Sequence, residues 1–279
     1  VKRKFMKRFD WFELFNFTAN ISSMPDCLVS VNPATGKVIR SYKVDSERKV
    51  EAVLRQSVQA FEAWRKLALG KRATVLRNIA KEIRKEKHRL VALAATEMGK
   101  PLQQGYYEVE KCAATLEFYA REGAGFLKDE VIPTSASKSY VSFQPLGTIL
   151  AVMPWNFPFW QVFRAMAPAV MAGNVMVLKH ASNVSGCALA IAELIVKAGA
   201  PEGLLQALLL PSSRVEALIN DSRIAAVTLT GSTAAGSSVA EAAGRNLKKA
   251  VLELGGSDPY VILADADLDV AVEIAVRGR

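Results

Sequence analysis

Residues 148–153, Thr-Ile-Leu-Ala-Val-Met, are a short apolar run followed by a helical pattern at residues 160–171 and a second apolar run at residues 175–178. An apolar run of this length is typical of a strand that is buried on both faces. The same alternation continues downstream, with apolar runs at residues 206–210, 226–229, 250–252 and 260–263 and helical patterns at residues 187–198, 215–219 and 237–247. It predicts a doubly wound, mainly parallel sheet of the Rossmann-like α/β class, with helices on both faces.

The chain upstream of this alternation follows a different period. From Val50 to Trp64, apolar residues recur three and four positions apart, and the same spacing returns in residues 76–83, 90–98 and 109–119. These patterns predict a mainly helical segment ahead of the sheet. Residues 140–144 alternate instead between polar and apolar side chains, which predicts one exposed strand between the two regions.

Composition and charge exclude several classes of protein. The 279 residues are 51% hydrophobic, which suits a globular chain with a sizeable core, and no apolar run approaches the roughly 18 residues of a membrane-spanning helix. The formal net charge is +9. Acidic and basic residues nevertheless alternate along the predicted helices, as at residues 85–87, so we expect neither a nucleic-acid partner nor a membrane.

Residues 1–23 form a basic, aromatic leader. Asp10 and Glu13 interrupt any apolar core of the kind that a signal peptide needs, so we do not expect a secretion signal. We expect this leader to be a disordered upstream extension of a domain that begins near residue 24.

The cysteines and the aspartates near the carboxyl end give no metal site. Cys27, Cys112 and Cys187 are scattered without paired spacing, so we expect three small buried residues in a reducing, cytoplasmic setting. Residues 265–269 place three aspartates at alternate positions, like the start of a calcium loop, but the glycine and the glutamate of such a loop are missing. We expect these aspartates to cap the final helix and predict no bound metal.

Polar residues follow several predicted strands, where a parallel sheet binds its ligands. Asn156, Lys179, the pair Gly231–Ser232 and Glu253 each come directly after, or at the end of, an apolar run. Because the carboxyl ends of parallel strands meet at one edge, we expect these residues to converge there.

Each of these features alone allows a simpler interpretation. Asn156 lies between two prolines, so its amide is either a fixed donor for a developing oxyanion or a stabiliser of the turn. Glu253 precedes two glycines and is either a base or an ordinary exposed carboxylate at a strand end. The loop at residues 230–236 is either a phosphate cradle at a helix start or a plain helix cap.

Taken together, the motifs resemble those of the NAD(P)-dependent aldehyde dehydrogenases, and particularly of the succinate-semialdehyde dehydrogenase branch. The resemblance covers residues 31–279 and rests on five motifs in the family's order. They are Pro-Trp-Asn-Phe-Pro at 154–158, Ala-Gly-Asn at 172–174, Leu-Lys-His-Ala at 178–181, Leu-Thr-Gly-Ser at 229–232 and Glu-Leu-Gly-Gly-Ser-Asp-Pro at 253–259. It implies that residues 24–279 are a cofactor-binding domain, ahead of a catalytic domain that is missing here.

The resemblance also implies a reaction. In this family a cysteine thiolate attacks the aldehyde, hydride passes to NAD(P)+, and the resulting thioester is hydrolysed to the acid. Asn156 would stabilise the oxyanion and Glu253 would activate water. The residues that would contact the cofactor are Trp155, Asn156, Lys179, His180, Ala181, Ser182, Gly231, Ser232 and Leu254.

Two further positions bear on cofactor and substrate choice. Many NAD-preferring relatives carry a glutamate where this chain has Ser182, so a 2′-phosphate should be tolerated and NADP is expected in preference to NAD. Arg164 lies where related enzymes hold the distal carboxylate of a semialdehyde. The alternative for Arg164 is an ion pair with an acid at a domain interface.

One departure from the family pattern limits these expectations. The family's nucleophilic cysteine follows the glutamate by roughly 30–35 residues, which lies beyond Arg279. The alternative to an active enzyme is therefore a catalytically silent NAD(P)-binding fragment or pseudoenzyme. For the full-length parent we expect a homo-oligomer, with the strand near residues 139–145 in the oligomerisation region. In this chain that strand should be unpaired, and an exposed strand together with an uncovered sheet face predicts aggregation.

Overall fold

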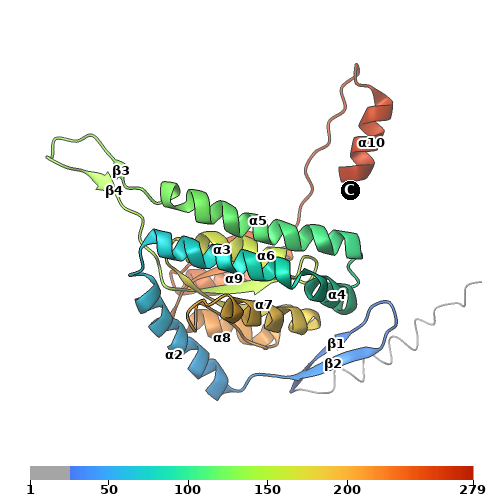
Figure 1. Cartoon of the computed structure of the whole chain (residues 1–279), viewed down its shortest axis with the longest axis horizontal. Coiled ribbons are helices and arrows are strands. Elements are labelled where there is room, and N and C mark those ends of the chain that lie inside the picture. The colour runs from blue at the N-terminus through green and yellow to red at the C-terminus, as the bar shows by residue number, and fades with distance from the viewer. Residues whose placement is uncertain (1–25, 279) are drawn as a thin grey trace, which may run out of the picture.

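The computed structural model describes residues 26–278, and its centre is a five-stranded parallel sheet (Figure 1). The strand order is β7-β6-β5-β8-β9, and every neighbouring pair is parallel. The strands are β5 (Thr148–Met153), β6 (Val175–His180), β7 (Leu205–Ala207), β8 (Ile224–Thr230) and β9 (Lys249–Glu253). The predicted doubly wound parallel sheet is confirmed.

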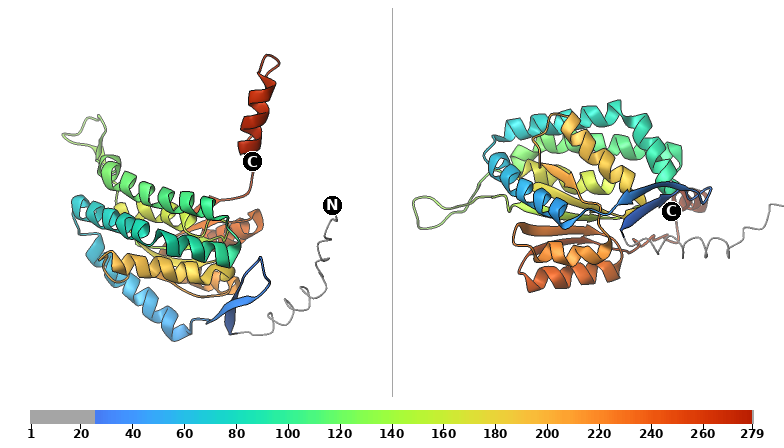
Figure 2. Two further views of the ribbon diagram at one scale, coloured as in Figure 1. Left: turned by 45° about the vertical axis from the view of Figure 1, so that its right-hand side comes forward. Right: turned by 90° about the horizontal axis from the view of Figure 1, so that it is seen from below.

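The helices form two layers around this sheet (Figure 2). The upstream helices are α2 (Glu47–Trp64), α3 (Leu69–Lys85), α4 (Lys87–Met98) and α5 (Leu102–Phe126). Those between or after the strands are α6 (Trp160–Met171), α7 (Ser185–Lys197), α8 (Val215–Asn220), α9 (Thr233–Arg245) and α10 (Leu268–Gly278), with short 3₁₀ turns η1 (Ser182–Val184) and η2 (Ser212–Arg214). The predicted helical segment ahead of the sheet is present.

Alternate residues of the central strands enter two separate cores. Ala151 and Met176 face the layer of α3, α5, α6 and α7, while Leu150 and Val177 face α8 and α9. Helix α2 contributes to both cores, and its last residue, Trp64, is fully buried and donates from Nε1 to Val170 O at 2.9 Å. Burial on both faces explains why these strands read as continuous apolar runs.

Two hairpins lie outside the main sheet. The strands β1 (Cys27–Val31) and β2 (Val38–Lys43) pair antiparallel, as do β3 (Glu130–Val131) and β4 (Tyr140–Val141). The strand predicted at residues 140–144 is therefore only two residues long, and it has a partner within this chain. The prediction that it would be unpaired was wrong, because the upstream residues of β3 fold back onto it.

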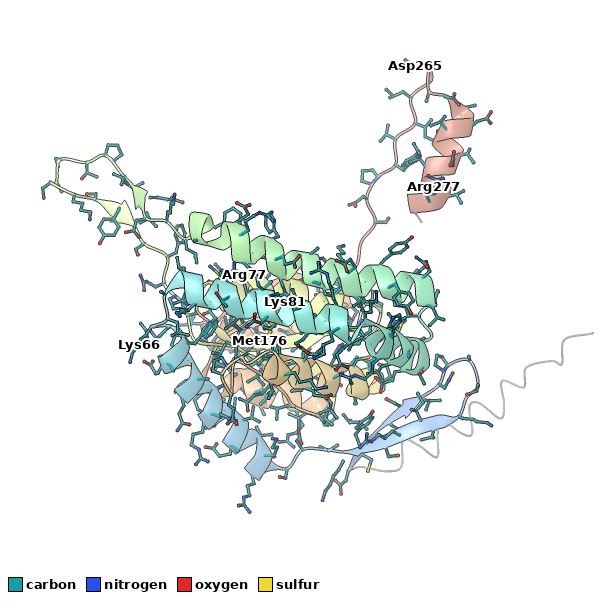
Figure 3. All side chains as sticks on the ribbon, viewed as in Figure 1. Lys66, Arg77, Lys81, Met176, Asp265 and Arg277 are labelled. Carbon is teal, nitrogen blue, oxygen red and sulfur yellow. The ribbon has the colours of Figure 1, made fainter. Side chains whose placement is uncertain are left out.

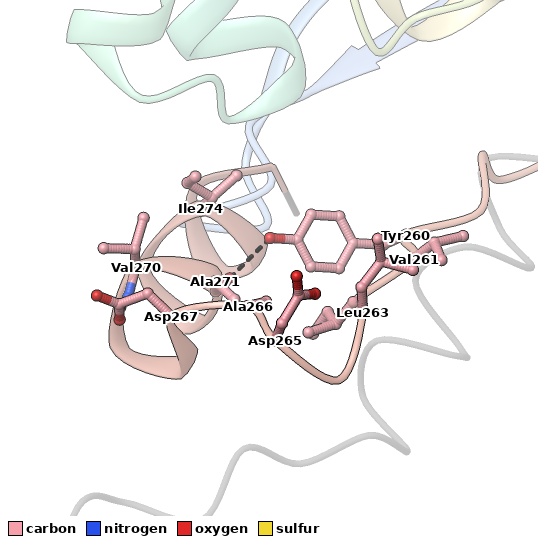
Figure 4. Close-up of a pocket in the computed structure, with 10 residues that line it drawn as sticks. Tyr260, Val261, Leu263, Asp265, Ala266, Asp267, Val270, Ala271 and Ile274 are labelled. Atoms are coloured by element: carbon pink, nitrogen blue, oxygen red, sulfur yellow. Dashed lines mark hydrogen bonds between the residues drawn. The ribbon is translucent and has the colours of Figure 1, made fainter.

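Helix α10 and the segment that leads to it stand away from the body of the protein (Figures 1 and 3). The strand predicted at residues 260–263 is absent, because this segment has no sheet beside it and its apolar side chains are exposed. Asp267 caps α10 by accepting from the amides of Asp269 and Val270, in keeping with the predicted capping role. Tyr260 donates its hydroxyl to Ala271 O at 2.8 Å across an open cavity of about 440 Å³ (Figure 4).

The cysteines lie in unlike surroundings. Cys112 and Cys187 are fully buried, as predicted, and burial raises the pKa of both thiols. Cys27 in β1 is only half-buried, so the prediction for this residue was wrong. The hairpin β1–β2 leaves it near the periphery, whereas the other two cysteines lie in core helices.

The predicted disordered leader falls outside the described residues.

A buried histidine joins the end of β6 to the loop after β5. Ala181 N donates to His180 Nδ1 at 2.9 Å, and His180 Nε2 lies 2.8 Å from Pro158 O. His180 Nδ1 also lies 3.2 Å from Met153 O, so each ring nitrogen faces a backbone carbonyl and the neutral ring can donate to one of them. Burial, aided by the nearby charge of Lys179, lowers the pKa of His180 to about 4, so the ring is neutral at physiological pH.

The contact between α5 and α6 can be tested at a pair of glycines. Gly123→Ala should lower the free energy of unfolding by about 1–3 kcal/mol, because its new methyl carbon would lie 2.4 Å from Met171 Cγ. Gly125 in the same helix has no atom within 4 Å of such a carbon. Gly125→Ala should therefore be neutral or stabilise the protein by up to about 1 kcal/mol. Urea unfolding compares the two variants, and equal midpoints would contradict the predicted contact.

The neutral histidine should make the protein less stable in mild acid. Between pH 6.5 and about 4 the unfolded chain binds a proton at His180 that the folded protein excludes, so stability falls as pH falls through this window. From pH 6.5 to 5 the loss should be about 1.5 kcal/mol. His180→Gln removes the titrating group. The free energy of unfolding of this variant, measured by urea unfolding at both pH values, should therefore fall less between pH 6.5 and pH 5. Parallel pH profiles for the two proteins would show that His180 is not responsible.

Candidate functional site

The carboxyl ends of four strands meet at one edge of the sheet. Met153 of β5 pairs with His180 of β6, and Thr230 of β8 pairs with Glu253 of β9. Since β5 also pairs with β8, the loops that follow all four strands leave the sheet on the same side. This edge brings together the loop that carries Asn156, the start of α9 and the side chain of Glu253.

Asn156 presents a free amide donor at this edge. Its Oδ1 accepts from the amide of Phe157 at 3.1 Å, which fixes the orientation of the side-chain amide. The Nδ2 group donates to no described residue, and the side chain is exposed, as is that of neighbouring Trp155. The turn therefore uses only the oxygen of Asn156 and leaves its two N–H groups for a ligand.

Two buried charged residues hold this loop from behind, and sequence reasoning missed both. Lys100 donates to Asn156 O at 2.9 Å and to Glu108 Oε2 at 2.5 Å, while Glu108 Oε1 accepts from the amides of Phe159 and Trp160. The signal available in the sequence is the position of Lys100, between a glycine that ends one helix and a proline that begins the next. That signal does not indicate what the lysine contacts.

Glu253 lies beside Arg164, on the helix that leaves the Asn156 loop. Arg164 Nη1 is 3.4 Å from Glu253 Oε2, and Nη2 donates to Thr230 Oγ1 at 3.3 Å. Half of the Glu253 side chain, 53%, remains exposed, so water can reach its carboxylate. The structure thus shows Arg164 paired with an acid, which is the alternative that the sequence left open, and the acid is the candidate base itself.

A groove of about 390 Å³ opens in front of this pair. It lies between α6 and the uncovered side of β8 and β9, and its walls include the apolar residues Ile149 and Val251 with Arg164 and Glu253 at the rim. A groove of this size, apolar with a few charged groups, suits a small organic molecule. It also matches the expectation that one face of the sheet is left partly uncovered.

The start of α9 offers backbone donors beside the groove. Ser232 caps the helix by accepting from Ala235 N at 3.3 Å, while the amides of Thr233 and Ala234 donate to no acceptor within the described part of the chain. Gly231 N is held by Glu253 O at 3.0 Å. Free amides at the start of a helix of 13 residues favour an anion.

Leu254 lies against this first turn because α9 carries a glycine there. A side chain on Gly236 would bring its first carbon within 2.5 Å of Leu254 Cδ2. The glycine therefore sets how closely Leu254 approaches the helix start, and 42% of Leu254 stays exposed toward solvent.

The end of β6 carries a buried cation without a partner. Lys179 is only 6% exposed, burial lowers its pKa, and it makes no hydrogen bond or ion pair with any residue from 26 to 278. Ala181 and Ser182 follow it and are half-buried. The Lys179 ammonium is not among the fully enclosed unpartnered atoms of the described residues, so it reaches solvent, where an anionic or hydrogen-bonding ligand can pair with it.

His180 differs from the other residues predicted to bind a cofactor. Both ring nitrogens lie against backbone groups inside the protein, and the residue is buried. Its imidazole is therefore not available for the predicted contact, and its role in the structure is to support the loop after β5. A lysine-histidine pair at a strand end does not reveal from its sequence which of the two faces inward.

No three His, Cys, Asp or Glu side chains of residues 26–278 gather into a metal-binding cluster. None of the helices in this range is long and apolar enough to span a bilayer.

Comparisons with known proteins place this chain among its relatives. The family model described as the aldehyde dehydrogenase family matches residues 21–279. A probable succinate-semialdehyde dehydrogenase [NADP(+)] of Synechocystis sp. is 50% identical over 252 residues, which are 90% of this chain and 56% of the relative. A succinate semialdehyde dehydrogenase [NAD(P)+] of Escherichia coli is 44% identical over 251 residues, 90% of this chain and 54% of that protein.

A solved structure gives the same result. The succinic semialdehyde dehydrogenase from Streptococcus pyogenes, in complex with NADP+, superposes with a TM-score of 0.84 at 37% identity, covering 87% of this chain and 53% of the other. The chain thus spans about half the length of the relatives that it matches. From the family match over residues 21–279 and from these identities, the chain belongs to the aldehyde dehydrogenase family.

Proposed function

We propose that residues 24–279 are the cofactor-binding part of an enzyme that oxidises succinate semialdehyde, or a similar small aldehyde, with NADP+ or NAD+. The observation that carries the proposal is the meeting of a free amide donor, a solvent-accessible carboxylate and a free helix start at one sheet edge. The names of the relatives from Synechocystis sp. and E. coli supply the substrate class.

The two catalytic roles follow from the exposed groups. Asn156 Nδ2 is oriented by the loop and can donate to an oxygen that gains negative charge when the aldehyde carbon is attacked. Glu253 is open to water and can accept a proton from the water molecule that hydrolyses the acyl intermediate. Its ion pair with Arg164 keeps the carboxylate at the rim of the groove.

The residues at the same edge suit a dinucleotide, which accepts hydride from the substrate when it is bound. The free amides at the start of α9 would hold the pyrophosphate, next to Gly231 and Ser232. Lys179 has no acid near it and would hold the adenosine ribose together with Ala181 and Ser182. Trp155 and Leu254, both exposed, would border the nicotinamide.

NADP is the cofactor that this edge favours. Ser182 adds no negative charge beside the buried cation of Lys179, so a 2′-phosphate would gain attraction without repulsion. The Synechocystis relative carries NADP(+) in its name, and the S. pyogenes structure was solved with NADP+.

Arg164 remains the candidate for a substrate carboxylate, although it is already paired. It lines the groove, and two of its nitrogens contact Glu253 and Thr230. A bound dicarboxylic semialdehyde would then share this guanidinium with Glu253, which would also bring the substrate close to the candidate base.

A second candidate function is nucleotide binding without oxidation. The cysteines of this chain are Cys27, Cys112 and Cys187; none of them lines the groove, and the last two are buried with raised thiol pKa values. This observation favours a silent NAD(P)-binding chain when residues 1–279 act alone.

The cysteines and the exposed β3–β4 hairpin bear on the compartment and on the assembly of the whole protein. Three cysteines without a disulfide suit a reducing compartment such as the cytoplasm. The hairpin β3–β4 exposes Val131 and Tyr140 well away from the body, and it would serve in homo-oligomerisation of the whole protein (Figure 1).

The catalytic roles can be separated in a chimera that continues this chain with the corresponding carboxyl-terminal part of the Synechocystis relative. Glu253→Gln should retain a burst of reduced cofactor and lose steady turnover, because only hydrolysis needs the base. Asn156→Ala should instead slow the burst by about a hundredfold or more. Stopped-flow absorbance with NADP+ and succinate semialdehyde measures both phases. A chimera that never reduces NADP+ would support the silent alternative.

Cofactor preference should depend on Ser182. Ser182→Glu places a negative charge beside the proposed 2′-phosphate, so the NADP+/NAD+ affinity ratio should fall by roughly ten- to a hundredfold. Calorimetric titration of this chain measures both affinities. Ser137→Glu, which adds the same charge at the exposed β3–β4 hairpin, should leave the ratio as it is. Equal ratios in the wild type and Ser182→Glu would exclude a phosphate at this position.

A further inference from the structure

We propose that the buried ion pair of Lys100 and Glu108 positions Asn156 for its role as an oxyanion donor. The inference rests on the proposed function, because it concerns the same loop. Neither residue reaches the exposed edge, since their side chains are only 3% and 1% exposed, so both act through the loop and contact no reacting atom.

Lys100 uses its whole ammonium group on this loop and on its partner. Nζ donates to Glu108 Oε2 at 2.5 Å and to Asn156 O at 2.9 Å, and it lies 3.6 Å from the centre of the Phe157 ring. An ammonium has three N–H donors, and a carboxylate, a carbonyl and a ring face satisfy them all. The charge is therefore fully compensated although it is buried.

Glu108 holds the other end of the same segment. Its Oε1 accepts from Phe159 N at 2.8 Å and from Trp160 N at 2.9 Å, where α6 begins. A carboxylate at the start of a helix is also favoured by the helix dipole. One ion pair thus fixes the carbonyl of residue 156 and the amides of residues 159 and 160.

The loop needs this outside support because it has few donors of its own. Pro154 and Pro158 carry no N–H, and the amide of Phe157 is used by the side chain of Asn156. The loop carbonyls are bound from outside, at residue 156 by Lys100 and at residue 158 by His180. With the 156 carbonyl held and Oδ1 tied to the next amide, the direction of Asn156 Nδ2 is set.

A purely structural role would make a different prediction. The pair also joins the α4–α5 corner to α6. Its loss would therefore lower the free energy of unfolding even if the pair did not position Asn156. Removing one partner of a buried ion pair is strongly destabilising, whereas replacing both partners by neutral groups is often tolerated. A positioning role predicts that function stays impaired after stability has been restored.

The test therefore compares Lys100→Met with the double variant Lys100→Met/Glu108→Gln. In the double variant the Gln oxygen can still accept from Phe159 N and Trp160 N, and no uncompensated charge is left in the core. Met at position 100 cannot donate to the carbonyl of Asn156, so the hydrogen bond that the wild-type lysine makes to the loop is lost. Lys111→Met is the matched control, because Lys111 contacts the same helix start, with Nζ 4.0 Å from the Trp160 ring, but is exposed.

Two measurements give the expected result. In this chain, hydrogen exchange of the Phe157 amide should be roughly tenfold or more faster in the double variant, while the urea midpoint returns toward that of the wild type. In the chimera with the Synechocystis carboxyl-terminal part, the burst should slow at least about tenfold with the KM for NADP+ unchanged. Lys111→Met should match the wild type in both measurements.

Wild-type exchange at Phe157 together with a wild-type burst in the stable double variant would overturn the proposal. Failure of the proposed function gives a different result: a chimera with Lys100 intact would then oxidise no aldehyde. In that case the exchange of the Phe157 amide in this chain decides whether the ion pair orders the loop.

Discussion

The arrangement of the candidate site depends on the parallel direction of the central strands. Parallel strands bury both faces, so helices must cover the sheet above and below, and every connecting loop that leads into a helix leaves from the same edge. The loop after β5, the end of β6, the start of α9 and the end of β9 meet for this reason. The groove appears where this coverage is incomplete, because no helix among residues 26–278 covers β8 and β9 on the side of α6.

Local periodicity was sufficient to predict the sheet and its helices. Residues 148–153 and 160–171 have the same bounds in the structure as β5 and α6, because both elements are buried strongly enough for their apolar pattern to be unambiguous. Residues 260–263 show where local periodicity fails to predict a strand. They carry the same kind of apolar run, but a strand needs a neighbour, and the segment leaves the body beyond β9 (Figure 3). The sequence also singled out Asn156 and Glu253 as candidates but gave no sign of the groups behind them, since the direction of a polar side chain at a strand end depends on tertiary contacts.

Three basic side chains are buried near the same edge, and each is accommodated differently. Lys100 forms an ion pair with Glu108, burial lowers the pKa of His180 so that its ring is neutral, and Lys179 has no acid near it in the described structure. The first two support the loop after β5, so their chemistry is satisfied within the protein. Only Lys179 is left for a ligand to stabilise, which separates the residues that support the site from those that would bind at it.

The support of the Asn156 loop also has a consequence for how the chain acquires its fold. Lys100 is separated by 56 residues from its loop partner, and Glu108 by 51 and 52 residues from the amides that it binds. Contacts of this separation form late in folding. During synthesis, however, both residues leave the ribosome before the loop does, since they precede it in the chain. The helical segment can therefore fold before residues 154–160 emerge, and the loop then adopts its conformation against that segment.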